Sequence, residues 1–293
     1  DEVNVAVHFS TPPAILDDRN PIQLAPGPDA VSEYAYVNDS DLVTRVTGLE
    51  PHTEYTVTLP AGLEDVFGQR LPEPFVARFK TGPALPAYTL DTGSWAVESA
   101  RAGYVAWARN VTRVEVIAAN PSEEELFSLL PALDWWDRDA VDLAALKIPH
   151  VNKVLNPGGE PNRYGQLRLE PKALLGNAAS KSRFYYIASR SPEVLDKHET
   201  DESGKPLPQG YREVLLNVTN LGVTSKLSGN SGLVWVTRLS DGAAQPGADV
   251  VVRARSGKVA WRGTTGADGT VSLPGRAALI GRGGAAEPNA HEA

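Results

Sequence analysis

The fold is decided by three consecutive stretches: GLVWVT at 232–237, PGADVVV at 246–252 and WRGTTGADGTVSL at 261–273. Apolar and polar residues alternate over short distances in each of them, which is typical of half-buried β-strands. Turn-forming pairs such as Asp241-Gly242 and Asp268-Gly269 stand between the strands. The pattern predicts an antiparallel β-sandwich over 216–293.

A second sandwich is predicted at the start of the chain, over 1–82. Val3, Val5, Val7 and Phe9 alternate as in a half-buried strand. The stretch LEPHTEYTVTL at 49–59 resembles the entry to a late strand of fibronectin III-like and bacterial Ig-like domains. This resemblance implies a tyrosine corner, in which the Tyr55 hydroxyl bonds to nearby backbone. The proline-containing residues 82–86 follow as a short, stiff linker.

The segment between these two, 87–215, is predicted to be a third sandwich that carries a helical and loop insertion near 120–163. Residues 120–130 read as a helix, because Ser122 and Glu125 have the spacing of a capping box and three acidic residues occupy the first turn. Residues 131–163 are rich in Pro, Gly, Asn and Asp and favour a long loop. Strands are expected at 104–107, 114–117, 166–169, 183–188 and 211–218, with a polar hairpin tip at 198–208.

Composition narrows the function classes. The net charge is −8 and no cluster of Lys and Arg occurs, which argues against a nucleic-acid or anionic-membrane partner. The absence of cysteine excludes disulfides, thiolate nucleophiles and cysteine-ligated zinc within the chain. No apolar run reaches the roughly 20 residues that span a bilayer. Methionine is also absent, so we expect a signal peptide or lipoprotein anchor to lie outside these residues.

No catalytic, cofactor-binding or metal-binding residues are predicted. The five histidines, at 8, 52, 150, 198 and 291, show no metal-ligand spacing, and no G-x-S-x-G elbow accompanies a serine. Gly281–Gly284 follows no strand–helix unit and therefore does not indicate a phosphate loop. The acidic residues near His198 could ligate a divalent cation, but a charged hairpin tip explains them better.

Trp135 and Trp136 lie among acidic residues, in the run DWWDRD at 134–139. Such tryptophans can stack on sugars or contact a partner protein. A structural role is the simpler interpretation, because adjacent Trp residues usually divide between the two faces of a segment.

Taken together, the stretches at 232–273 resemble the macroglobulin-like (MG) domains near the N-terminus of bacterial alpha-2-macroglobulins. Residues 87–215 resemble them more weakly, and 1–82 resembles a bacterial Ig-like domain. An MG domain needs one or two more strands than 276–293 supplies, so we expect the last domain to be truncated. The implied fold class is all-β, a tandem of Ig-like, fibronectin III-like and MG-like antiparallel sandwiches.

The resemblance implies a structural role in a periplasmic or cell-surface protein that traps proteases. In similar proteins a protease cuts a bait segment, the MG ring closes around it, and in many members a thioester then acylates it. This chain has no cysteine for a thioester and no convincing bait. We therefore expect it to be neither an enzyme nor an inhibitor by itself, and to need no cofactor. Its expected partners are the remaining MG domains and, through the full-length protein, target proteases; it is expected to be a monomer.

Two other hypotheses remain open at this stage. Tandem sandwiches are also typical of cell-surface adhesins and of cell-wall or glycan-binding proteins, and Trp135 and Trp136 would then be candidate contacts. An accessory sandwich in front of a hydrolase domain is the third possibility. Fold alone does not decide among these.

Overall fold

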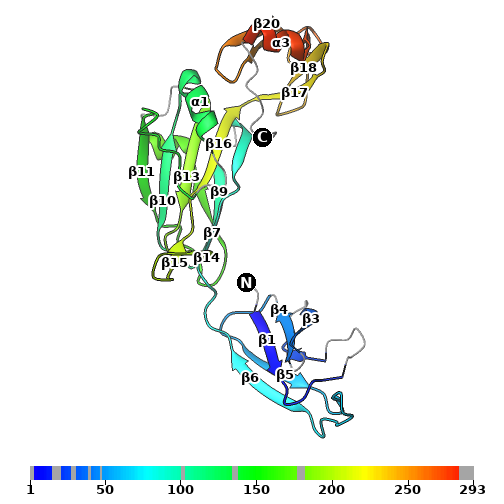
Figure 1. Cartoon of the computed structure of the whole chain (residues 1–293). Coiled ribbons are helices and arrows are strands. Elements are labelled where there is room, and N and C mark those ends of the chain that lie inside the picture. The colour runs from blue at the N-terminus through cyan, green and yellow to red at the C-terminus, as the bar shows by residue number, and fades with distance from the viewer. Residues whose placement is uncertain are drawn as a thin grey trace. The chain divides into compact units, whose positions relative to one another are not determined.

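The structure is a computed structural model that describes residues 3–14, 21–27, 31–38, 41–46, 48–99, 103–133, 138–176 and 182–283. The contacts divide the chain into two compact units, Asp1–Pro86 with Glu160–Arg163, and Ala87–Gly159 with Tyr164–Ala293. Small sheets dominate both units, so the predicted all-β class is confirmed (Figure 1). No helix in the described ranges is both long enough and apolar enough to cross a bilayer.

The first unit consists of two three-stranded antiparallel sheets, in the orders β1-β4-β3 and β2-β5-β6. Its strands are β1 (Val3–His8), β2 (Gln23–Ala25), β3 (Val31–Asn38), β4 (Asp41–Val46), β5 (Glu54–Leu59) and β6 (Phe75–Lys80). Alternate β5 residues, Tyr55, Val57 and Leu59, are buried, as the period of two requires. The Tyr55 hydroxyl accepts a hydrogen bond of 2.8 Å from the Glu50 amide, which confirms the predicted tyrosine corner.

A five-stranded sheet in the order β11-β10-β13-β16-β8 is the centre of the second unit, and a three-stranded sheet in the order β12-β9-β7 faces it. The strands of the larger sheet are β8 (Gly93–Glu98), β10 (Val114–Ala119), β11 (His150–Leu155), β13 (Phe184–Arg190) and β16 (Arg212–Thr219). Those of the smaller sheet are β7 (Ala87–Thr89), β9 (Tyr104–Arg109) and β12 (Gly165–Leu169). The hydroxyls of Tyr88 and Ser189 share a buried hydrogen bond of 2.6 Å. Burial raises the pKa of Tyr88 to about 12, so this hydroxyl stays protonated.

Both faces of the five-stranded sheet are covered. Val116, Ile187 and Val214 point into the core shared with the smaller sheet and with α2 (Pro171–Leu175). Tyr186 and Leu215 point to the opposite face, where the segment following β10 covers them. This arrangement explains why five consecutive residues in the middle of β13 are buried. A strand with one solvent-exposed face would instead alternate between buried and exposed side chains.

The covering segment begins with α1 (Glu123–Leu129), followed by a short 3₁₀ helix η2 (Leu130–Ala132). The predicted helix and its capping box are confirmed. The Ser122 hydroxyl accepts from the Glu125 amide at 3.2 Å, and the Glu125 carboxylate accepts from the Ser122 amide at 2.7 Å. Leu126 and Leu129 are the buried residues of α1, and they pack on the sheet face.

Ser122→Ala is expected to lower the free energy of unfolding by about 1 kcal/mol, because one amide of the first turn loses its acceptor and the capping box opens. Chemical denaturation of the purified chain measures this. Ser128→Ala is the matched control within α1, since Ser128 is exposed. The control should be neutral or slightly stabilising, because Ala is the better helix former. Equal losses in both variants would contradict the capping assignment.

Two features of the larger sheet differ from the sequence interpretation. Residues 150–155, expected to be loop, form β11 and pair with β10, so the loop expectation for 131–163 is wrong there. The sandwich is also not purely antiparallel, because β8 pairs with β16 in parallel. Parallel neighbours require a long connection, which here contains most of the unit.

The last part of the chain forms a three-stranded sheet in the order β17-β18-β21 and a two-stranded sheet, β19-β20. The strands are β17 (Leu221–Leu227), β18 (Ser231–Arg238), β19 (Asp249–Arg253), β20 (Val259–Thr264) and β21 (Thr270–Pro274). No strand was expected after residue 275, and within the described residues 276–283 are helical instead. These residues form α3 (Arg276–Gly283), which buries Leu279 in the same core as Val234 and Val236. Residues 284–293 lie outside the described residues.

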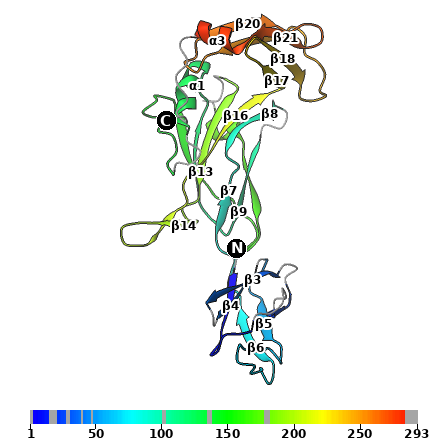
Figure 2. The same ribbon diagram turned by 45° about the vertical axis from the view of Figure 1, so that its right-hand side comes forward.

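A hairpin of β14 (Leu195–Thr200) and β15 (Pro206–Pro208) projects from the second unit (Figure 2). Its turn is closed by the Asp201 carboxylate, which accepts from the amides of Ser203 and Lys205 at 2.9 and 3.0 Å. The predicted polar hairpin tip at 198–208 is therefore confirmed. Its Asp201 stabilises the turn.

Candidate functional site

Charged side chains gather on the larger sheet, on the face that α1 covers, around Glu115. Glu115 lies on the same face of β10 as Ile117, and Arg190 of β13 lies directly opposite it in the register. Arg113 precedes β10, and Tyr211 precedes β16. Strand pairing thus brings together residues that lie almost 100 positions apart in the sequence.

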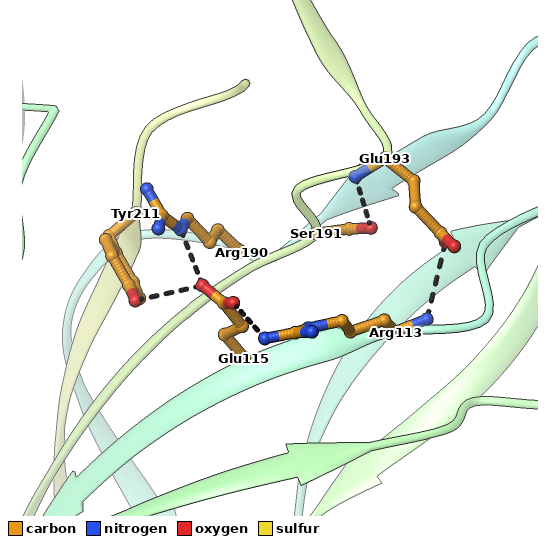
Figure 3. Close-up of polar contacts among 6 residues, drawn as sticks. All are labelled: Arg113, Glu115, Arg190, Ser191, Glu193 and Tyr211. Carbon is orange, nitrogen blue, oxygen red and sulfur yellow. Dashed lines mark hydrogen bonds and ion pairs between the residues drawn. The ribbon is translucent and has the colours of Figure 1, made fainter. Parts of the chain in front are cut away.

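The Glu115 carboxylate accepts from three side chains (Figure 3). Arg190 Nε donates at 2.9 Å, Arg113 Nη2 at 2.8 Å and the Tyr211 hydroxyl at 3.4 Å. The guanidinium of Arg190 also lies 4.4 Å from the centre of the Tyr211 ring, within cation–π range. The four side chains form one connected network rather than separate ion pairs.

A second carboxylate, Glu193, extends the network. It accepts from the Thr112 hydroxyl at 2.6 Å, from the Thr112 amide at 2.5 Å and from the Arg113 amide at 3.3 Å. Its own amide donates to the Ser191 hydroxyl at 3.4 Å (Figure 3). Glu193 therefore fastens the turn after β13 to the start of β10.

The electrostatics indicate a structural network rather than an acid–base site. Burial alone would raise the pKa of Glu115, but the hydrogen bonds and charges of Arg190 and Arg113 outweigh it and hold that pKa below 4.5. The donors around Glu193 lower its pKa in the same way, against burial. A general base at neutral pH needs a pKa near 7 and a free lone pair aimed at substrate. Both carboxylates are instead fully engaged and ionised.

Glu115→Gln is expected to lower the free energy of unfolding at pH 7 by about 2 kcal/mol, because two guanidinium groups lose a charged acceptor. The folded pKa of Glu115 is depressed, so its contribution is complete above the ordinary value of 4.5 and is lost as pH falls through the lower folded value. The stability difference between wild type and variant should therefore shrink toward pH 3. Denaturation at pH 7, 5 and 3 measures it.

Glu202→Gln serves as the control for that series, because Glu202 is an exposed residue in the turn of the β14–β15 hairpin. Its effect should stay within about 0.5 kcal/mol at every pH. A Glu115→Gln difference that remained constant down to pH 3 would rule out the ionised network as its source.

A buried polar contact fastens the covering segment to the sheet. Tyr186 is fully buried, and its hydroxyl donates to the carboxylate of Glu213, which is 4% exposed. The Val141 amide donates to the same carboxylate at 2.9 Å and to the Tyr186 hydroxyl at 3.2 Å. Burial, followed by the neighbouring Glu213 charge, raises the pKa of Tyr186, so its proton stays in place. Because solvent and substrate cannot reach this contact, it stabilises the packing of the covering segment on the sheet.

The residues that the sequence singled out for possible sites are placed as follows. Glu199, beside His198, pairs with Arg138, and Asp201 closes the hairpin turn. Asp268 accepts from the Thr270 amide at 2.9 Å, which confirms a turn at 268–269. Trp135 and Trp136 lie outside the described residues. Within the described ranges, no three His, Asp or Glu side chains converge as ligands for a metal ion.

Part of this chain matches a protein family, and a larger part matches a known relative. Residues 218–289 match the family model described as "Bacterial alpha-2-macroglobulin MG3 domain". An alpha-2-macroglobulin homolog from Nostoc sp. is 26% identical over 242 residues, which is 76% of this chain and 11% of the relative. The resemblance to bacterial alpha-2-macroglobulins is confirmed.

Solved alpha-2-macroglobulins have the same fold. Salmonella alpha-2-macroglobulin reacted with methylamine has a TM-score of 0.58 at 18% identity, covering 94% of this chain and 16% of that one. A mutant of the Salmonella protein has a TM-score of 0.57 at 16% identity, covering 93% and 16%. The chain thus spans between a tenth and a sixth of the length of these alpha-2-macroglobulins.

Proposed function

We propose that the chain is an architectural segment, the N-terminal sandwich domains, of a bacterial alpha-2-macroglobulin that traps proteases after cleavage of a bait segment. The observation that carries this proposal is the MG3-domain match over 218–289, which coincides with the sandwich built from β17 to β21 and α3. The likeness to the Nostoc homolog extends it over most of the chain.

In this proposal the segment positions the trap and performs no chemistry. It has no cysteine to form a thioester, and the carboxylates of the Glu115 network are engaged in fastening strands together. It is accordingly neither an enzyme nor an inhibitor alone. Its partners are the other MG domains of a longer chain and, through them, target proteases, and its location is the periplasm or the cell surface.

The test compares two proteins: the native full-length protein that contains these residues, and the 293-residue chain alone. Each is incubated with trypsin, and hydrolysis of casein and of a small amide substrate is followed in parallel with a denaturing gel. A trap protects casein from the enclosed protease, but it leaves the small substrate accessible.

The full-length protein is expected to be cleaved once, at its bait, and to lower casein hydrolysis while amide hydrolysis continues. The 293-residue chain is expected to change neither rate. A covalent adduct on the gel would indicate a thioester member, and protection without an adduct a non-covalent trap. Inhibition by the 293-residue chain, or random degradation of the full-length protein, would overturn the proposal.

A further inference from the structure

The two sheets of the last sandwich differ in width, so one strand of the wider sheet has nothing opposite it. The wider sheet has the order β17-β18-β21, and the other is the pair β19-β20. β20 contacts β21 and α3, and aligned packing therefore places β19 over the middle strand, β18. Within the part of the chain that the structure describes, the β19-β20 sheet has no third strand, so none lies over β17.

The core-facing side chains of β17 show the consequence. Val223 lies opposite Val236 in the register, and Leu227 lies opposite Gly232. Val236 belongs to the core, so Val223 and Leu227 are on the core-facing side of the sheet. Val223 is nevertheless 65% exposed and Leu227 is 49% exposed. Only the first residue of β17, Leu221, packs against the core, which leaves a bare apolar strip along the rest of the strand.

The edge of β19 beside this strip carries unpaired backbone groups. The Thr265 amide donates to the Ala248 carbonyl at 3.0 Å, and the Ala248 amide donates to the Thr265 hydroxyl at 2.8 Å. The backbone of Ala248 thus points to β20, and alternation along the strand points that of Asp249 and Val251 away from β20. No described residue hydrogen-bonds to the amide or carbonyl of Asp249 or Val251. Such an edge is a template for a further strand.

The free edge and the bare strip select the same occupant. A strand paired with β19 would lie about 4.8 Å from it and, since sheets pack about 10 Å apart, directly over β17. Every second side chain of that strand would then meet Val223, Ser225 or Leu227. Lys226 is on the outer face, opposite Leu233, so these inward side chains would be apolar. A helix bonds its own backbone groups and has none to offer β19.

We propose that the open side of the last sandwich accepts an added β-strand from a partner polypeptide. The added strand pairs with the backbone of Asp249 and Val251, and its alternate apolar side chains cover Val223 and Leu227. No covalent bond is made or broken. This inference does not depend on protease trapping, and either can fail without the other.

The experiment titrates the 293-residue chain with two synthetic octapeptides whose termini are blocked. The first, KTVTVTVK, alternates threonine and valine. The second, KTVPPTVK, has the same charge, but its two central prolines remove one amide from each of its edges. Calorimetry and amide chemical shifts follow both titrations. Saturable binding of KTVTVTVK is expected, and the proline peptide should bind about tenfold more weakly or not at all.

Hydrogen exchange identifies the edge that the peptide occupies. The Val251 amide should exchange rapidly in the free chain, because it has no acceptor among the described residues. At saturating KTVTVTVK it should become protected. The amide of Gly263, which lies opposite Val250 in the β19–β20 ladder, should be protected in both states.

Val223→Asp is expected to weaken binding of KTVTVTVK by about tenfold or more, because the added strand would cover an unpaired carboxylate. Leu233→Asp is the matched control, since Leu233 is 44% exposed on the opposite face of the same sheet. It should leave the Kd unchanged. Val251→Pro removes the edge amide without altering β17, and proline is tolerated on an edge whose N–H faces solvent. It should also weaken binding, and it tests the pairing even if Val223→Asp disturbs the fold.

Four results would overturn the proposal: no saturable binding of KTVTVTVK, equal affinity for the proline peptide, equal losses in Val223→Asp and Leu233→Asp, or an unchanged Kd in Val251→Pro. Protection of the Val223 and Ser225 amides in place of the Val251 amide would overturn it as well, because the strand would then extend the sheet at β17. Sedimentation of the chain alone tests another occupant. A concentration-dependent dimer that Val223→Asp dissociates would overturn the partner strand in favour of a second copy.

Discussion

Replacing Gly269 by Ala is expected to destabilise the last sandwich by about 3 kcal/mol. Gly269 has a φ of +75°, where a side chain is strained by about 1–2 kcal/mol. A Cβ there would also lie 2.5 Å from the carbonyl oxygen of Val236 and 2.9 Å from the amide of Gln245. That carbonyl accepts the Gln245 amide at 2.9 Å, so relieving the clash would also lengthen a backbone hydrogen bond.

Gly242→Ala separates the two causes. Gly242 has a similar φ of +71°, but nothing lies within 4 Å of the position that its Cβ would take. Only the backbone strain remains, and the expected loss is about 1 kcal/mol. Hydrogen exchange of the β18 and β21 amides reports the stability of this sandwich directly. Equal losses for the two variants would show that the close approach to Val236 has no energetic weight.

Replacing Ile187 by Ala is expected to have the largest effect, about 4 kcal/mol. Ile187 is fully buried on β13, the central strand of a sheet that is covered on both faces. Truncation removes apolar contacts and leaves a cavity that neighbours on two paired strands cannot readily fill. Chemical denaturation monitored by circular dichroism measures the loss in the free energy of unfolding.

Val154→Ala is the matched control, since Val154 lies in β11 of the same sheet and is 61% exposed. Its cost should stay within about 0.5 kcal/mol. A loss of less than 1 kcal/mol for Ile187→Ala would contradict a tightly packed interior between the two sheets.

Local patterns in the sequence predicted the elements that depend on neighbouring residues. The strands at 232–237 and 270–273, the capping box at Ser122 and the tyrosine corner at Tyr55 all rest on spacings of a few positions. The domain boundaries at 82–87 and 215–216 remain predictions, and the structure groups the chain into two units.

Elements whose stability comes from distant partners could not be read in this way. β11 contains Asn and Lys and directly follows Pro149, and its pairing with β10 is what makes it a strand. α3 is rich in Gly and Ala, and packing of Leu279 against the last sandwich stabilises it. The sequence also gives no sign that β8 pairs in parallel, because register and direction are properties of the partner strand.

The candidate site also depends on partners that are distant in the sequence. Arg113 and Glu115 are two residues apart and could be seen to share a strand face, but Arg190 and Tyr211 join them only through strand pairing.

The parallel pairing of β8 with β16 has a consequence for synthesis of the chain. Gly93 pairs with Val214, 121 positions later, and closing so long a loop costs about 4 kcal/mol of chain entropy before the contact forms. At roughly 5–20 residues per second, the ribosome produces β8 about 10 s before its partner. During that interval β8 and its Trp95 have no strand to pair with, and the five-stranded sheet closes only once β16 has emerged from the ribosome.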